Sequence, residues 1–100
     1  MTRVYKYILD PAVSTVTLPV DAEILHVSDQ HGDLCLWARV DPTITATEKH
    51  RINIVGTGHP IDDEQYGFKW KHLGTSLLHG GSLVLHVFVE QPITPPRKFS

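Results

Sequence analysis

Residues 51–61 read Arg51-Ile52-Asn53-Ile54-Val55-Gly56-Thr57-Gly58-His59-Pro60-Ile61 and join a strand to a glycine-rich turn. The apolar, β-branched residues Ile52, Ile54 and Val55 are typical of a strand. The strand ends at Gly56–Gly58, because glycine permits positive φ and close backbone approach. The proline after His59 fixes its own φ and favours an extended conformation at that histidine. Backbone N–H groups, a hydroxyl and an imidazole therefore gather at one turn, which suits a small polar or anionic ligand.

Short strand-like segments recur along the chain, separated by proline and glycine at intervals of roughly ten residues. None keeps a helical apolar period for more than about eight residues. The pattern predicts an all-β domain, as a compact antiparallel sandwich or a small barrel. At most one short helical turn is expected, at the acidic run 62–65, because acidic side chains suit a helix N-terminus. The expected strands are 4–9, 13–18, 22–28, 34–40, 51–55 and 82–90, with 66–73 as a strand or an ordered loop.

The pairing of these strands follows from the turns between them. Segments 4–9 and 13–18 are expected to form one hairpin, and 22–28 with 34–40 a second and clearer one. Segment 43–49 is expected to be a loop. In the 34–40 strand one face is uniformly apolar and should point to the core, namely Leu34, Leu36, Ala38 and Val40. Both faces of 82–90 are apolar, which predicts a central strand.

Length and composition narrow the class of protein. The chain has 100 residues, 41% of them hydrophobic, and a formal net charge of −2. These values predict a single globular β domain over 1–91 with a Pro-rich tail over 92–100, and they argue against binding to long nucleic acid or to anionic membranes. No membrane span or signal peptide is indicated. The lone cysteine, Cys35, fits a reducing cytoplasm and a buried structural thiol.

Catalytic and metal sites have little support in the residue spacing. Seven histidines are present, but none is paired at a spacing typical of zinc ligands. Whether His26 and His86 are buried stays open. No serine nucleophile motif occurs, and no metal or cofactor is expected. Carboxylates at Asp62 and Asp63 follow His59 closely, so a small phosphodiesterase is the enzyme alternative, although solvated charge is the favoured explanation of the acidic run.

A second candidate region alternates aromatic and basic residues over 66–72. Aromatic rings stack on nucleobases at roughly 1–3 kcal/mol each, and Arg51 would pair with phosphate. The alternative is a half-buried strand with Trp70 pointing inward and the lysines pointing to water. Both interpretations hold together if Trp70 or Trp37 lines a pocket at a subunit boundary. The candidate ligand-binding residues are Arg51, Gly56, Thr57, Gly58, His59, Trp70 and Trp37.

The sequence also resembles a family of small bacteriophage proteins over roughly residues 4–89. The block Gly56-Thr57-Gly58-His59-Pro60-Ile61 is the most specific part of the resemblance, supported by Leu36-Trp37, Val40-Asp41-Pro42, Leu73-Gly74-Thr75 and His86-Val87-Phe88. The resemblance implies a phage accessory protein in the cytoplasm of the infected bacterium. It transfers no catalytic residue.

Three functions are weighed on this basis. The leading hypothesis is a homo-oligomer that sequesters a small nucleotide-type immune signal, a cyclic nucleotide or an ADP-ribose derivative, and so counters bacterial antiviral defence. Arg51 and the turn would hold phosphates, Thr57 and His59 would bond ribose or base, and an aromatic ring would stack. The alternative is a non-catalytic structural or protein-interaction domain of a phage, with residues 92–100 as an arm. The enzyme is ranked last.

Overall fold

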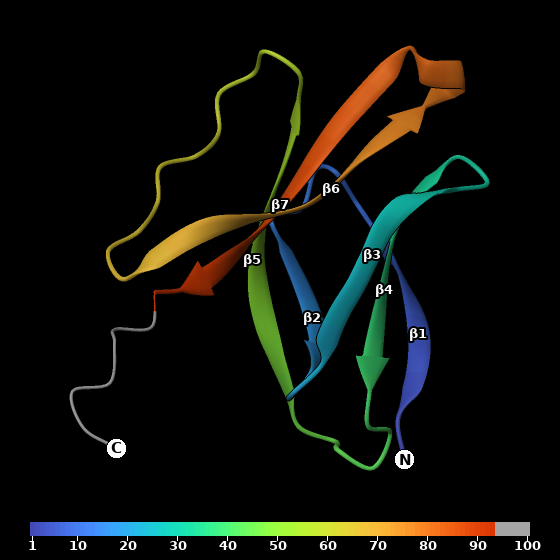
Figure 1. Cartoon of the computed structure of the whole chain (residues 1–100), viewed down its shortest axis with the longest axis vertical. Coiled ribbons are helices and arrows are strands. Elements are labelled where there is room, and N and C mark those ends of the chain that lie inside the picture. The colour runs from blue at the N-terminus through green and yellow to red at the C-terminus, as the bar shows by residue number, and fades with distance from the viewer. Residues whose placement is uncertain (94–100) are drawn as a thin grey trace.

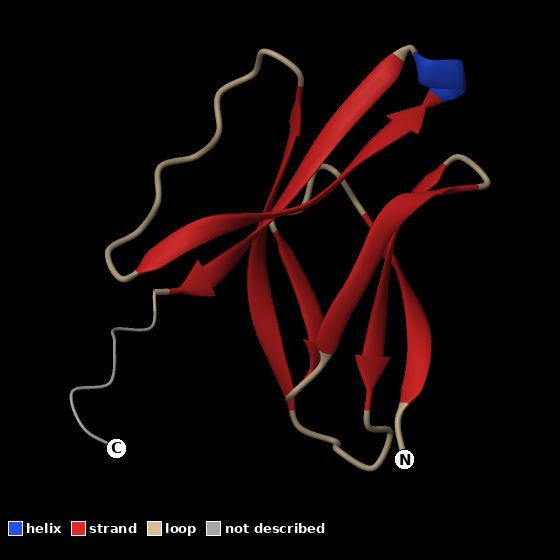
Figure 2. Ribbon diagram, viewed as in Figure 1, coloured by secondary structure: helices blue, strands red, loops and turns tan. Residues whose placement is uncertain are grey.

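The structure is a computed structural model, and it describes residues 1–93. Seven strands form two antiparallel sheets (Figures 1 and 2). One sheet has three strands in the order β1-β4-β3, and the other has four in the order β2-β5-β7-β6. The strands are β1 (Arg3–Leu9), β2 (Thr15–Pro19), β3 (Glu23–Gln30), β4 (Asp33–Val40), β5 (Thr47–Gly56), β6 (Phe68–Leu78) and β7 (Leu83–Pro92). The prediction of an all-β antiparallel fold is confirmed, and it takes the form of a sandwich.

The core lies between the inward faces of the two sheets. In β4 the predicted apolar face is fully buried, and in β7 the alternate residues Leu85, Val87 and Val89 are buried with it. Burial of apolar side chains at every second position is what a two-sheet packing requires. Cys35 is buried as well, as a free thiol. The cluster comprises Leu9, Val16, Leu18, Val27, Leu34, Leu36, Ala38, Val40, Ile52, Leu78, Leu85, Val87 and Val89.

Two of the expected pairings are decided by the register. The β3–β4 hairpin forms as predicted, with Gln30 opposite Asp33 at its tip. The predicted hairpin of β1 with β2 is wrong, because β1 pairs with β4 and β2 pairs with β5 in the other sheet. A turn separates them, in which the Val13 N–H donates to the Asp10 carbonyl oxygen at 2.9 Å. This turn carries the chain from one sheet to the other, where β2 adds Val16 and Leu18 to the shared core and β1 adds Leu9.

Three further boundaries differ from the sequence-based expectation. Strand β5 begins at Thr47, inside the segment expected to be a loop. Strand β6 runs without a break past Gly74, with a register shift between His72 and Gly74. The acidic run 62–65 forms no helical turn, and the one short 3-10 turn of the described residues is at His79–Gly81 instead.

The end of the sandwich strand β7 lies at Pro92, which pairs with Phe68 of β6. The Ile93 N–H then donates to the Gly67 carbonyl oxygen at 2.8 Å. Most of the expected Pro-rich tail, residues 94–100, lies outside the described residues. Within residues 1–93, no helix is long and apolar enough to cross a membrane.

Candidate ligand-binding face

The outward face of β5, β7 and β6 collects most of the polar and aromatic side chains singled out above. Strand alternation turns every second residue of these strands away from the core. The register then places Trp70 opposite Glu90 and Thr75 opposite His86 on β6 and β7, and Val55 opposite His86 on β5 and β7. We call this surface the outer face; it is bordered by the long segment 57–67, which connects β5 to β6 (Figure 1).

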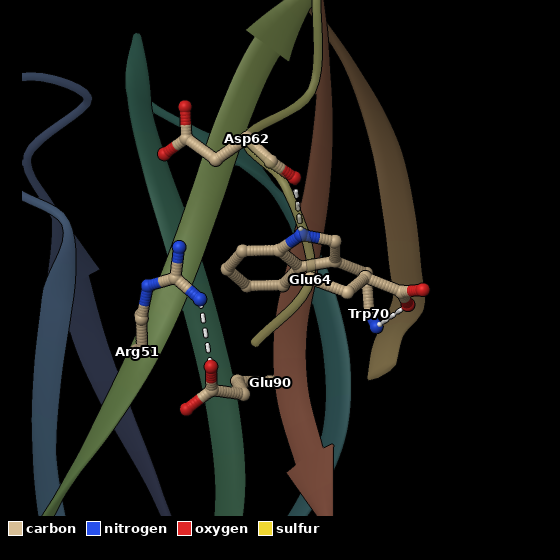
Figure 3. Close-up of polar contacts among 5 residues, drawn as sticks. All are labelled: Arg51, Asp62, Glu64, Trp70 and Glu90. Atoms are coloured by element: carbon tan, nitrogen blue, oxygen red, sulfur yellow. Dashed lines mark hydrogen bonds and ion pairs between the residues drawn. The ribbon is translucent and has the colours of Figure 1, made fainter. Parts of the chain in front are cut away.

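Arg51 and Trp70 meet on the outer face, although nineteen positions separate them in the chain. The guanidinium carbon of Arg51 lies 4.5 Å from the centroid of the Trp70 ring, within the range of a cation–π contact. Arg51 Nη1 also donates to Glu90 Oε2 at 2.7 Å, and Figure 3 shows the carboxylate beside the stacked pair. Arg51 is thus already paired with a carboxylate rather than free for a phosphate.

Trp70 anchors the segment 57–67 to the sheet. Its indole Nε1–H donates to the Asp62 carbonyl oxygen at 2.8 Å, and its backbone N–H donates to Glu64 Oε2 at 2.6 Å (Figure 3). A buried or half-buried tryptophan normally finds such a partner for its N–H. Arg51 and Trp70 therefore act as positioning residues that hold one wall of the outer face, and the acidic run contributes a backbone carbonyl and a carboxylate to that wall.

The glycine-rich turn is a four-residue turn closed by a hydrogen bond from the His59 N–H to the Gly56 carbonyl oxygen at 3.0 Å. Gly58 has φ +86°, a conformation that favours glycine at this position. The His59 ring folds back over Gly56, where an added Cβ atom would lie 3.1 Å from Nδ1. The backbone conformation thus favours glycine at position 58, whereas a side chain at position 56 would require the His59 ring to shift by a few tenths of an ångström.

A chain of hydrogen bonds leads from this turn across the outer face. Thr57 Oγ1 lies 2.7 Å from His86 Nε2, and His86 Nδ1 lies 2.9 Å from Thr75 Oγ1. Thr75 Oγ1 in turn lies 3.1 Å from His72 Nε2. His86 is half-buried and the other three are exposed. We call these four residues the Thr–His chain; it connects the tip of the glycine-rich turn to strand β6.

A groove runs along the free edge of β5 beside the same turn. Its volume is about 540 Å³, and Asn53, Gly56, His59 and Asp62 contribute to its lining together with the segment 11–14. Asn53 is only 7% exposed, and its Nδ2 has no hydrogen-bond partner among the described residues. A buried amide donor without a partner is costly. We call this the edge groove; its size falls in the range of small-molecule sites.

The structure brings most of the predicted site residues to one side of the molecule and leaves one apart. Arg51, Trp70 and the turn 56–59 share the four-stranded sheet. Trp37 lies on β4 of the other sheet, opposite Lys6 and His26, with its ring centroid 6.0 Å from that of His26. Within one chain it does not join the outer face.

Four residues of the outer face were missed by the sequence analysis as parts of a site. They are Thr75, His86, Glu90 and His72, the last of which was noted only as part of the candidate region 66–72. The outward position of His86 follows from strand alternation, but its partners depend on the register of β6 against β7, which no local pattern encodes. Within residues 1–93, no group of three or more His, Cys, Asp or Glu side chains could hold a metal ion.

Comparison with known proteins gives a family. The family described as "Domain of unknown function (DUF7352)" matches residues 1–97. The chain belongs to this family. No curated protein and no solved structure matches the chain. For this DUF7352 member, function is therefore argued from the outer face itself.

Proposed function

We propose that this DUF7352 chain is a binding module that holds a small nucleotide-type ligand at the glycine-rich turn, between the edge groove and the Thr–His chain. The observation that carries the proposal is the meeting of these two features at residues 56–59. Gly56 and His59 line the groove, while Thr57 between them is hydrogen-bonded to His86. A ligand with phosphate or ribose oxygens finds hydroxyl, imidazole and backbone donors here within one turn.

The ligand class follows from the chemistry of the lining. Apolar side chains such as Val55 and Leu85 make one part of the edge groove, and the polar residues of the turn make another. This mixture suits a ligand with a flat apolar ring and an oxygen-rich portion. Arg51 would contribute indirectly, by holding Trp70 and through it the wall formed by Asp62. Binding without conversion is part of the proposal.

The resemblance to small phage proteins suggests a more specific ligand, namely a cyclic nucleotide or an ADP-ribose derivative. Bacterial antiviral systems use such molecules as signals, so a phage protein that binds one would sequester it in the host cytoplasm. A homo-oligomer would place Trp37 of one copy near the outer face of another, and so restore the predicted stacking partner. The ligand identity, the sequestering role and the homo-oligomer are parts of the same proposal.

Native mass spectrometry tests the proposal, with the purified protein before and after mixing with cyclic dinucleotides and ADP-ribose derivatives. The expected result is a complex whose added mass equals that of an intact ligand, which heat releases unchanged. A released ligand of altered mass would instead indicate the phosphodiesterase, with His59 and Asp62 as the first residues to replace. No added mass with any ligand of the panel would contradict the proposal.

A second candidate function, protein interaction, is favoured by the backbone of β5. Strand β2 pairs with β5 only as far as Arg51, and the Ile52 N–H donates to the Ser14 carbonyl oxygen at 2.8 Å. Beyond Ile52, no described strand covers this edge of β5. Because alternate residues of a strand point their N–H groups to the same edge, the Ile54 N–H also faces the edge groove. An extended segment of a partner protein could add here as a further strand.

A displayed library of random heptapeptides tests this second candidate. Enrichment of β-branched, extended sequences that bind the chain but lose binding to the Ile54→Pro variant would support strand addition, since proline removes the edge-facing N–H. Equal binding to the unaltered chain and to the Ile54→Pro variant, or no enrichment, would contradict strand addition.

A further inference from the structure

The Thr–His chain connects Thr57, at the glycine-rich turn, to His72 on β6. Whether the Thr57 hydroxyl donates or accepts a hydrogen bond therefore depends on the tautomers of the histidines in the chain. Three contacts of 2.7, 2.9 and 3.1 Å connect Thr57, His86, Thr75 and His72 in that order. Both ring nitrogens of His86 are engaged, one on each side. Because the Thr75 hydroxyl has one hydrogen to donate, its role toward His86 limits its role toward His72.

Proton counting leaves three arrangements for neutral rings. A hydroxyl carries one hydrogen, and a neutral imidazole carries one N–H and one acceptor nitrogen. If His86 carries its hydrogen on Nε2, it donates to Thr57, accepts from Thr75 at Nδ1, and Thr75 must accept from Nε2–H of His72. Thr57 then has its own hydrogen free to donate outward.

The other two arrangements reverse both bonds of His86. With its hydrogen on Nδ1, His86 donates to Thr75 and accepts the Thr57 hydrogen at Nε2. Thr75 then either donates to His72 Nε2, with the His72 hydrogen on Nδ1, or accepts from His72 Nε2–H through its second lone pair. In both states the Thr57 hydroxyl has no hydrogen left and offers a ligand only its lone pairs.

We propose that His72 and Thr75 are specificity-determining residues that govern, through His86, how readily Thr57 donates to or accepts from a ligand at the glycine-rich turn. Nε2–H on His86 requires Nε2–H on His72, and Nδ1–H on His72 requires Nδ1–H on His86. An acceptor ligand such as a phosphate oxygen selects the Nε2–H pair. The coupling of the rings belongs to the free protein; its consequence for ligand choice rests on the proposed function.

The test uses nitrogen-15 NMR of the histidine rings, which separates the two tautomers, at a pH where both rings are neutral. We expect the Nε2–H fraction of His72 to equal or exceed that of His86 in the unaltered protein. Thr57→Asp, whose carboxylate only accepts hydrogen bonds, should move both rings to the Nε2–H tautomer. Thr75→Val removes the connecting hydroxyl at nearly constant shape, so in Thr57→Asp/Thr75→Val only His86 should remain shifted.

The double variant is also the control for the charge of the new carboxylate, because a through-space effect on His72 would survive Thr75→Val. A larger Nε2–H fraction for His86 than for His72 in the unaltered protein would overturn the coupling. So would a His72 ring that follows residue 57 in the Thr75→Val background. In either case circular dichroism would confirm that the variants keep the β fold.

Inorganic phosphate separates the coupling from the proposed function. If phosphate shifts both rings toward Nε2–H, the ligand-choice part of the inference is supported together with the binding site. If the Thr57→Asp series behaves as expected and phosphate has no effect, the coupling holds, whereas anion binding at Thr57 is contradicted.

Discussion

The Arg51 guanidinium carbon lies over the Trp70 ring, 4.5 Å from its centroid, while Arg51 Nη1 donates to Glu90 Oε2 at 2.7 Å. The side chains of Arg51 and Glu90 are only 26% and 15% exposed. A pair so far removed from water makes each partner costly to remove singly, because the other is left as an unpaired, poorly solvated charge.

Arg51→Ala is accordingly expected to lower the free energy of unfolding by about 2 kcal/mol, a charge-assisted hydrogen bond plus the lost stacking. Glu90→Gln in the same chain should recover part of that loss, since no orphaned charge remains. Urea unfolding of the two single variants and the double variant measures the coupling. Strictly additive losses would show that the ion pair does not contribute in this way.

Trp70→Phe should loosen the segment 57–67 while leaving the sandwich folded. Phenylalanine retains the ring beside Arg51 but cannot donate to the Asp62 carbonyl oxygen, a bond of 2.8 Å in the structure. Hydrogen exchange followed by mass spectrometry should show faster exchange in peptides covering 57–67. Trp37→Phe, in the other sheet, is the matched control and should leave these peptides unchanged. Equal exchange in both variants would refute the anchoring role of Trp70.

Ser76 presents an unpaired hydroxyl to the core. It is 2% exposed, and its Oγ has no hydrogen-bond partner within residues 1–93. Ser76→Ala should therefore raise the free energy of unfolding by about 1 kcal/mol, since an unsatisfied buried polar group is removed. Ser82→Ala is the contrasting variant, because Ser82 Oγ donates to the His79 carbonyl oxygen at 2.8 Å. Urea unfolding of the two variants measures the change in the free energy of unfolding. Destabilisation by Ser76→Ala would mean that the Ser76 hydroxyl has a hydrogen-bond partner.

Asp41 makes the free energy of unfolding depend on pH in the acidic range. The Thr43 hydroxyl, and after it the Thr43 backbone N–H, lower the pKa of Asp41 below its ordinary value of 3.8. A lowered folded-state pKa stabilises the fold above the unfolded-state pKa, and this contribution is lost as the pH falls through the folded-state value. Thr43→Val removes the 2.7 Å hydroxyl bond, so the variant should be less stable than the parent at pH 7.

The difference between parent and Thr43→Val should vanish once Asp41 is protonated in both states. Unfolding curves at pH 7 and at pH values below the carboxyl range measure it, and an NMR titration should show the pKa of Asp41 moving up in the variant. A stability difference that is the same at every pH would point to an effect unrelated to ionisation.

How far the sequence predicts this fold depends on whether a feature is local. The alternation in 34–40 and 82–90 correctly predicted a buried apolar face and a strand with neighbours on both sides, because strand periodicity is written in consecutive residues. The predicted partner of β1 was wrong. Nearness in sequence favoured β2, whereas the turn at Asp10 leads the chain into the other sheet. Strand pairing over long sequence distances leaves no such local signal.

The local features of the candidate site were likewise predicted from the sequence, whereas its long-range contacts were not. The turn at 56–59 is a local feature and was found from its glycines. The meeting of Arg51 with Trp70 was proposed only as a shared ligand contact, but the structure adds Glu90 as a third partner and makes the cluster a support for segment 57–67. The histidines of β6 and β7 were passed over because only the register, with Thr75 opposite His86, shows that they connect to Thr57.

The measurement that tests the proposed site most directly is amide chemical-shift mapping of the nitrogen-15-labelled protein with ADP-ribose and with a cyclic dinucleotide. We expect saturable shifts centred on residues 56–59, extending to Thr75 and His86, with Trp37 responding only in an oligomer. No shift at saturating ligand, or shifts confined to the three-stranded sheet, would contradict the placement of a nucleotide-binding site on the outer face.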